Sequence, residues 1–102
     1  MRNKVERNPR HEIGFSWTKW SRKNLSTYQA AVFTLLRMPN DVPIERLWRR
    51  ISNDKNMPHR GQQMRIGAII SRINGKLEPL GYIIKPGAYR KTYRLRLRQP
   101  GE

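Results

Sequence analysis

The 102-residue chain has no cysteine, and no hydrophobic run in it is long enough to cross a lipid bilayer. Without cysteine, the protein cannot form disulfide bonds, thiolate nucleophiles or cysteine-ligated zinc sites, and such a composition is typical of a reducing compartment. The basic N-terminal residues also lack the apolar segment of a secretory signal peptide. We therefore expect a cytoplasmic protein with no membrane partner.

Acidic residues are also scarce. Asp and Glu number 7 against 22 Lys and Arg, so the formal net charge is +15. A field of this sign attracts polyanions, and a nucleic acid is the most common polyanionic partner of so basic a domain. A membrane surface would require a free amphipathic helix with bulky apolar residues facing lipid, and the pattern contains none.

Residues suited to catalysis are few and far apart. His11 and His59 lie in different polar segments, without metal-ligating partners at a useful spacing. There is no phosphate-binding glycine loop of the Walker type and no nucleophile elbow. We therefore expect no enzyme activity, no metal and no cofactor; a nuclease built from Asp41 and Glu45 is the weakest of the alternatives.

The strongest periodic signal lies in the segment 62–77. Its apolar residues recur at helical spacing and form a single stripe, which comprises Ile66, Ile69, Ile70, Ile73 and Leu77. Arg65, Ala68, Ser71 and Arg72 fall on the opposite face. Pro79 stops the helix near Glu78. The pattern predicts a long helix over about 61–78, with one buried side and one small, basic side.

Two shorter helices are predicted before it. Ser26 and Gln29 have the spacing of a capping box, which indicates a helix from there to about Met38. A second helix is predicted from Pro43 to about Ile51, with Val42 before it as a lone extended residue that pairs with a strand. The side chains expected to face the core are Tyr28, Ala31, Val32, Leu35, Leu36, Ile44, Leu47, Trp48 and Ile51.

The remaining segments have strand or loop character. Residues 12–18 alternate apolar and polar and predict a short strand, followed by a basic link over 19–24 in which Trp20 either packs on the domain edge or stacks on a ligand. Residues 82–84 and 92–98 flank the basic turn 85–91 and predict a β-hairpin. We expect a flexible basic arm over 1–11, one domain over 12–98 and a short polar tail over 99–102.

Three helices closed by a C-terminal hairpin is the plan of the winged helix, an α+β variant of the helix-turn-helix. In this plan the third helix, about 61–78, lies in the major groove of DNA, and the wing, 85–91, contacts the backbone or the minor groove. The sequence therefore predicts that Arg65 and Arg72 are exposed and lie level with the wing turn.

Several motifs follow one another in a recognisable order: Leu25-Ser26-x-x-Gln29, Leu35-Leu36, Val42-x-x-x-x-Leu47-Trp48, Ile69-x-Ser71-Arg72-Ile73-x-x-Lys76-Leu77-Glu78-Pro79 and Tyr93-Arg94-Leu95. Over roughly Leu25 to Leu97 the chain resembles the DNA-binding effector domain of OmpR/PhoB-type response regulators. Thr92 stands where that family has a glycine before Tyr-Arg. We expect the module to act without a receiver domain.

The resemblance implies a winged-helix fold and dimeric or tandem binding to direct repeats of DNA. It also implies contact with RNA polymerase through the loop before the recognition helix, which corresponds here to 52–60. By position, Arg65, Ala68, Ser71 and Arg72 would face the major groove. Arg90, Lys91 and Arg94 would be wing contacts.

The leading hypothesis is a nucleoid-associated, sequence-specific regulator of transcription that binds double-stranded DNA. The residues expected to contact DNA are Arg60, Gln62, Arg65, Ala68, Ser71, Arg72, Lys76, Lys85, Arg90, Lys91 and Arg94. Two alternatives remain open. One is an architectural protein that binds DNA or RNA without specificity, and the other is a phage-type winged-helix inhibitor of a host protein.

Overall fold

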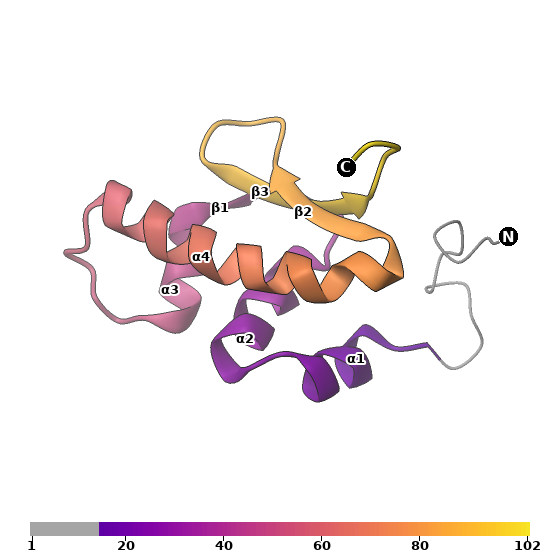
Figure 1. Ribbon diagram of the computed structural model, residues 1–102. Helices are drawn as coiled ribbons and strands as arrows, with labels where there is room; N and C mark the ends of the chain where they lie inside the picture. The colour runs from indigo at the N-terminus through magenta and orange to yellow at the C-terminus, as the bar shows by residue number, and fades with distance from the viewer. Residues whose placement is uncertain (1–14) are drawn as a thin grey trace, which may run out of the picture.

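In a computed structural model, which describes residues 15–102, four α-helices pack against a small three-stranded antiparallel sheet, so the α+β class is confirmed (Figure 1). The helices are α1 (Trp17–Asn24), α2 (Thr27–Leu36), α3 (Ile44–Ile51) and α4 (His59–Leu77), and a 3₁₀ helix, η3 (Glu78–Leu80), follows α4. The strands are β1 (Val42–Pro43), β2 (Tyr82–Pro86) and β3 (Thr92–Leu97). The predicted arm, 1–11, lies outside the described residues.

Helix α4 is the long helix that the isoleucine pattern predicts. Ile66, Ile73 and Leu77 are completely buried, and Ile69 packs against the same core from a partly buried position. The helix begins at His59, slightly earlier than predicted, because the extended backbone of Pro58 already serves as its N-cap. It ends at Leu77 and gives way to η3 at Glu78, just before Pro79, and Gly81 closes the turn with a left-handed φ of 81°.

Helix α2 begins with the predicted capping box. The Ser26 hydroxyl accepts a hydrogen bond from the Gln29 backbone N–H at 3.4 Å, and the Gln29 side-chain oxygen accepts one from the Ser26 N–H at 3.3 Å. The expected burial of Tyr28 is wrong, because this side chain, in the first turn of α2, is 62% exposed beside an open groove. Phe33, which the pattern did not single out, is completely buried.

The predicted strand over 12–18 and the link over 19–24 are wrong where the structure describes them. Residues 12–14 lie outside the described part, and Trp17–Asn24 is helix α1, whose N-cap is Ser16. Helical spacing turns the rings of Trp17 and Trp20 toward Phe33, at centroid distances of 5.1 and 5.5 Å. Packing of these rings outweighs the alternation of apolar and polar residues that predicted a strand. Trp20 thus packs on the domain, and the alternative in which it stacks on a ligand is wrong.

We call this group of rings the aromatic cluster; it consists of Phe15, Trp17, Trp20, Phe33 and Tyr82. Trp17 is its centre and makes edge-on contacts with the four other rings, at centroid distances of 5.0 to 5.5 Å. The cluster fastens α1 to α2 and to the first residue of β2. The N-terminal part of the described chain is therefore held by aromatic packing and not by strand pairing.

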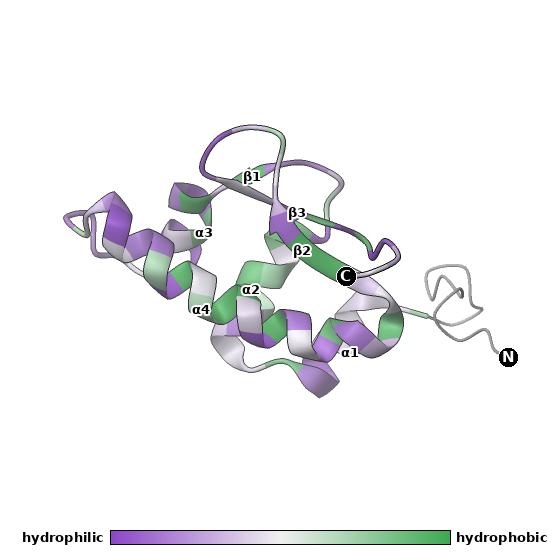
Figure 2. Ribbon diagram, turned by 45° about the horizontal axis from the view of Figure 1, so that its top comes forward, coloured by the Kyte–Doolittle hydropathy of each residue, from purple (hydrophilic) through white to green (hydrophobic). Residues whose placement is uncertain are grey.

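The C-terminal hairpin is formed as predicted, by β2 and β3, with Ile84 opposite Leu95. Val42 pairs with Tyr93, as predicted, but Pro43 is also extended and pairs with Thr92, so α3 begins one residue later than predicted; the strand order is β1-β3-β2. Asn74 of α4 fastens the hairpin, because its amide donates to the Ile84 carbonyl at 2.9 Å and accepts from the Ile84 N–H at 2.7 Å. Hydrophobic residues gather where α2, α4 and β2 meet, whereas the first turns of α4 are hydrophilic (Figure 2).

Among the helices of residues 15–102, none combines the length and the apolar character that crossing a bilayer requires.

Candidate nucleic-acid interface

One side of α4 is open to solvent along its whole length. We call it the α4 face; it comprises the exposed residues Arg60, Met64, Arg65, Ala68, Ser71, Arg72 and Gly75. At about 100° per residue, these positions fall opposite the buried stripe. Arg60, Arg65 and Arg72 make no hydrogen bond and no ion pair with any residue of the described chain. Their charges are thus available to an external anion.

The α4 face has two different edges. Figure 1 shows the β2–β3 hairpin along one side of α4 and α2 along the other. On the hairpin edge, His59 and Gln63 line a shallow pocket of about 220 Å³ together with Arg90 and Lys91 of the turn. A Cβ at Gly67 would lie 3.9 Å from the Tyr93 hydroxyl, so the side chain of Tyr93 reaches the helix from β3 there.

On the α2 edge, Arg65 and Arg72 line a groove of about 460 Å³ together with Ser26 and Tyr28 of the α2 end and Ile51 of α3. The predicted exposure of the two arginines is confirmed. Their predicted position level with the wing turn is wrong, because they lie on the edge away from the turn. The α4 face is therefore flanked by cations on both sides, with the turn on one side and Arg65 and Arg72 on the other.

The turn between β2 and β3 is held by Asp41, whose side chain is 8% exposed. Its Oδ2 accepts hydrogen bonds from the backbone N–H groups of Ala88, at 2.8 Å, and Tyr89, at 3.2 Å. A Cβ at Gly87 would lie 2.6 Å from the Asp41 carboxyl carbon, so only glycine lets the chain pass there. Lys91 closes the turn with a left-handed φ of 58°.

The turn presents its cations outward. Tyr89, Arg90 and Lys91 have exposed side chains that make no hydrogen bond or ion pair within residues 15–102. The phenol ring of Tyr89 is 75% exposed at the tip. The turn thus exposes two positive charges and one aromatic ring, and the Asp41 carboxylate, from another part of the chain, holds its backbone in place.

Three of the predicted contact residues are already engaged. Gln62 is wrong as a contact: it is 6% exposed, because it lies one turn before Ile66 on the buried side, and its amide donates to the Met57 carbonyl at 2.9 Å. Arg94 pairs with Asp41 at 3.3 Å on the outer side of the sheet. Lys76 donates to the Gln29 side-chain oxygen at 3.1 Å, which holds it toward α2.

The other predicted contact residues are exposed and without a hydrogen-bonding or ion-pairing partner in the described chain: Arg60, Arg65, Ala68, Ser71, Arg72, Lys85, Arg90 and Lys91. Arg60, Arg65, Ala68, Ser71 and Arg72 lie on the α4 face and Arg90 and Lys91 on the turn, whereas Lys85 belongs to β2. Met64 and Gln63 are exposed beside them but were not among the predicted contacts. Asp41 was not predicted to support the turn, because its partners are distant in sequence.

The outer face of the sheet is less positive than its sequence implies. Arg96 is paired with Glu102 at 2.6 Å, just as Arg94 is paired with Asp41. The hydrogen bond from Arg96 and a second one from the Gln99 N–H lower the pKa of the Glu102 carboxyl from 4.5 to about 2. Two arginines of β3 are thus neutralised locally, whereas Arg90 and Lys91 on the turn and Arg98 after β3 have no ion-pair partner in the described chain.

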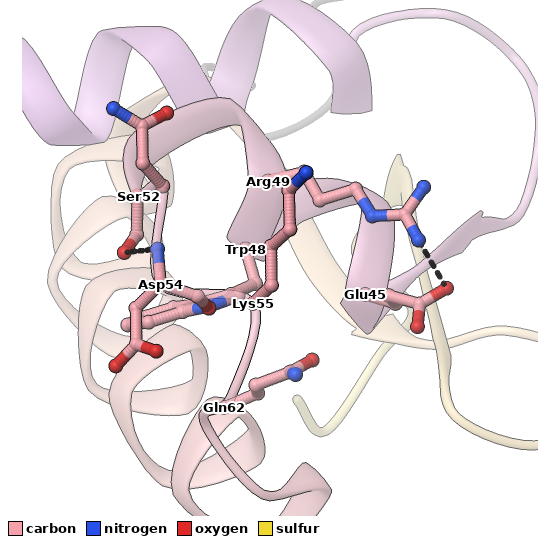
Figure 3. A pocket seen from close by; sticks show the side chains of 8 residues that line it. Glu45, Trp48, Arg49, Ser52, Asp54, Lys55 and Gln62 are labelled. Atoms are coloured by element: carbon pink, nitrogen blue, oxygen red, sulfur yellow. Dashed lines mark hydrogen bonds and ion pairs between the residues drawn. The ribbon is translucent and has the colours of Figure 1, made fainter.

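The loop between α3 and α4 borders a pocket of about 470 Å³ (Figure 3). The Trp48 indole N–H donates to the Asp54 carbonyl at 3.0 Å and ties the loop to α3. Glu45, paired with Arg49 at 3.5 Å, and Asp54 bring carboxylates to the pocket. Arg49 and Lys55 line the same pocket, so it carries both signs of charge, and Glu45 also lines the pocket on the hairpin edge. Contact of the loop 52–60 with RNA polymerase stays a prediction.

Comparison of the chain with family models, with curated proteins and with solved structures found no match. Within residues 15–102, no group of three or more histidine and acidic side chains is placed to hold a metal ion.

Proposed function

We propose that the chain is a sequence-specific regulator of transcription, in which α4 enters the major groove of double-stranded DNA and the β2–β3 turn contacts the adjacent backbone. The order of elements supports a winged helix, since α2, β1, α3 and α4 are followed by a hairpin, with β3 between β1 and β2. The major groove is about 12 Å wide and admits a single helix.

The observation that carries this proposal is the distribution of unpaired charge. Arg65 and Arg72 lie along one edge of the α4 face, and Arg90 and Lys91 lie beside the other. A helix seated in the groove has a phosphate backbone on each side, so cations on both edges match both backbones. The residues between those edges are then directed at the bases.

One observation favours binding without specificity. Exposed arginines without a partner in the described chain also occur on α3, at Arg46 and Arg50, and the net charge is +15. Charge spread over several elements would hold any duplex, or RNA, through its phosphates alone. The two functions differ in one measurable quantity, the ratio of affinities for selected and random sequences.

The deciding experiment is a selection from a random-sequence duplex library, followed by fluorescence anisotropy at physiological salt. We expect an enriched motif that binds at least about 10³-fold more tightly than random duplex. Because Arg72 lies on an edge of the α4 face that borders a phosphate backbone, Arg72→Ala should weaken binding to selected and random duplexes alike. Equal affinity for every duplex would establish the non-specific function, and absence of DNA binding would refute both.

A further inference from the structure

Met64 is the large apolar side chain of the α4 face, and it lies in the second turn of the helix. It is 70% exposed, which is more than any other large aliphatic side chain in residues 15–102. Ala68 follows it one turn later, and both lie between the edge that borders the turn and the edge that carries Arg65 and Arg72. A flexible apolar side chain is therefore presented at the centre of a cationic surface.

The surroundings of Met64 decide which partner fits. A protein partner that covered an exposed methionine would also have to neutralise Arg60, Arg65 and Arg72, none of which has an acidic partner in the described chain. A nucleic-acid duplex has two rows of phosphates, one on each side of a groove. These phosphates neutralise the arginines at the edges of the α4 face, and no acidic group is needed at its centre. Charge complementarity thus favours a duplex over an apolar protein surface.

Within the major groove, the apolar group at a base edge is the C5 methyl of thymine, whereas the other groups presented there are hydrogen-bond donors and acceptors. A thioether side chain forms no strong hydrogen bond, but it packs well against a methyl group. On the basis of the proposed function, we infer that Met64 is a specificity-determining residue that recognises a thymine methyl group, so the preferred target carries thymine opposite the second turn of α4.

The test uses deoxyuridine, which lacks this methyl group but keeps the Watson–Crick pairing of thymidine. The probe is the tightest duplex from the random-sequence selection, resynthesised with deoxyuridine at one thymidine position at a time, and the protein is the full chain. At one or two positions we expect the wild-type affinity to fall about fourfold, which is the value of burying one methyl group. At the other positions the affinity should not change.

Three variants assign this effect to a side chain. Met64→Ala should bind the thymidine and deoxyuridine duplexes equally, whereas Met64→Leu, which stays apolar, should keep most of the ratio. Arg90→Ala, on the turn, should weaken both duplexes alike and leave the ratio unchanged. Because Met64 and Arg90 are exposed, all three variants should fold, and thermal unfolding checks this.

The possible outcomes separate this inference from the proposed function. Sequence-specific binding with no effect of deoxyuridine at any position overturns the inference and leaves the proposed function intact. If Met64→Ala still binds the thymidine duplex more tightly than the deoxyuridine duplex by the wild-type ratio, the inference is also overturned, because the methyl group then contacts a different residue. If no duplex is enriched, the proposed function fails and the inference fails with it. A ratio that is lost in Met64→Ala alone supports both.

Discussion

At the scale of single residues, the shape of the wing turn depends on Asp41, which lies 47 residues before its partner Ala88 in the sequence. Its carboxylate accepts from two backbone N–H groups and from the Arg94 guanidinium. Because the side chain is 8% exposed, water can replace these bonds only in part. Loss of the carboxylate should therefore destabilise the backbone of the turn before the rest of the fold.

We predict that Asp41→Asn lowers the free energy of unfolding by about 1–3 kcal/mol, because one amide oxygen cannot replace a charged acceptor for two N–H groups and a guanidinium. Denaturant unfolding measures the change, and hydrogen exchange of the Ala88 and Tyr89 amides should become faster. Asp54→Asn is the matched control, since Asp54 is exposed and its side chain accepts from a single N–H, that of Asn56. Equal losses in the two variants would contradict a special role of Asp41.

Single residues also show where inference from sequence stops. Gln62 was expected at the interface because it is polar, but it lies one turn before Ile66 and its position on the buried side outweighs its residue type. Tyr28 was expected in the core because it is apolar, but the first turn of α2 extends past its neighbours. In both cases the position along the helix, and not the residue type, decides burial.

At the scale of elements, α2, α3, α4 and the hairpin follow from local pattern, because caps and helical or alternating periodicity act within a few residues. Helix α1 could not be predicted from local pattern, because the alternation of Phe15 and Trp17 is typical of a strand. The rings that stabilise it as a helix by packing on Trp17 are Phe33 and Tyr82, which belong to elements distant in sequence. The exposed position of the α4 face was predictable for the same local reason. Its arrangement relative to the turn required the packing of α4 against β2.

The segment after β3 provides a prediction on pH. The pKa of Glu102 is lowered in the folded chain from 4.5 to about 2, chiefly by the hydrogen bond from Arg96. A lowered carboxyl pKa means that the pair stabilises the fold fully above pH 4.5 and that this contribution is lost as the pH falls toward 2. An NMR titration of the Glu102 side chain should give a midpoint near the lower value.

In Arg96→Ala the same titration should move most of the way back to the ordinary value, because the principal hydrogen bond and the nearest positive charge are gone. The Gln99 N–H still donates to Glu102 at 2.8 Å, so a small part of the shift should remain. If Glu102 titrates at the same pH in both proteins, Arg96 is not the cause of the lowered pKa.

At the scale of the whole molecule, the sequence predicts the net charge but not where it acts. Arg94 was predicted as a wing contact, yet Asp41 from the loop before β1 neutralises it, and Glu102 likewise neutralises Arg96. These pairings join residues that no local pattern connects. Cations without an ion-pair partner in residues 15–102 lie on the α4 face and on the turn, and others lie on α1 and α3, on β2 at Lys85 and after β3 at Arg98.

This distribution predicts a position-dependent salt effect. Arg90→Ala should reduce the slope of log affinity against log salt by about 0.9, the value for one lost phosphate contact on duplex DNA. Arg22→Ala removes the same charge from an exposed position on α1, and it should leave the slope unchanged. Anisotropy titrations at several salt concentrations measure both slopes. If the two variants reduce the slope equally, charge acts irrespective of its position, as in non-specific binding.

The aromatic cluster has a practical consequence for such measurements. Trp17 is surrounded edge-on by four rings at 5.0 to 5.5 Å, so the indole has a rigid and asymmetric environment. Chromophores held in this way produce near-ultraviolet circular dichroism, and the signal disappears when tertiary packing is lost. The near-ultraviolet signal of Trp17 thus reports whether α1 is packed against α2 and β2, without an added dye.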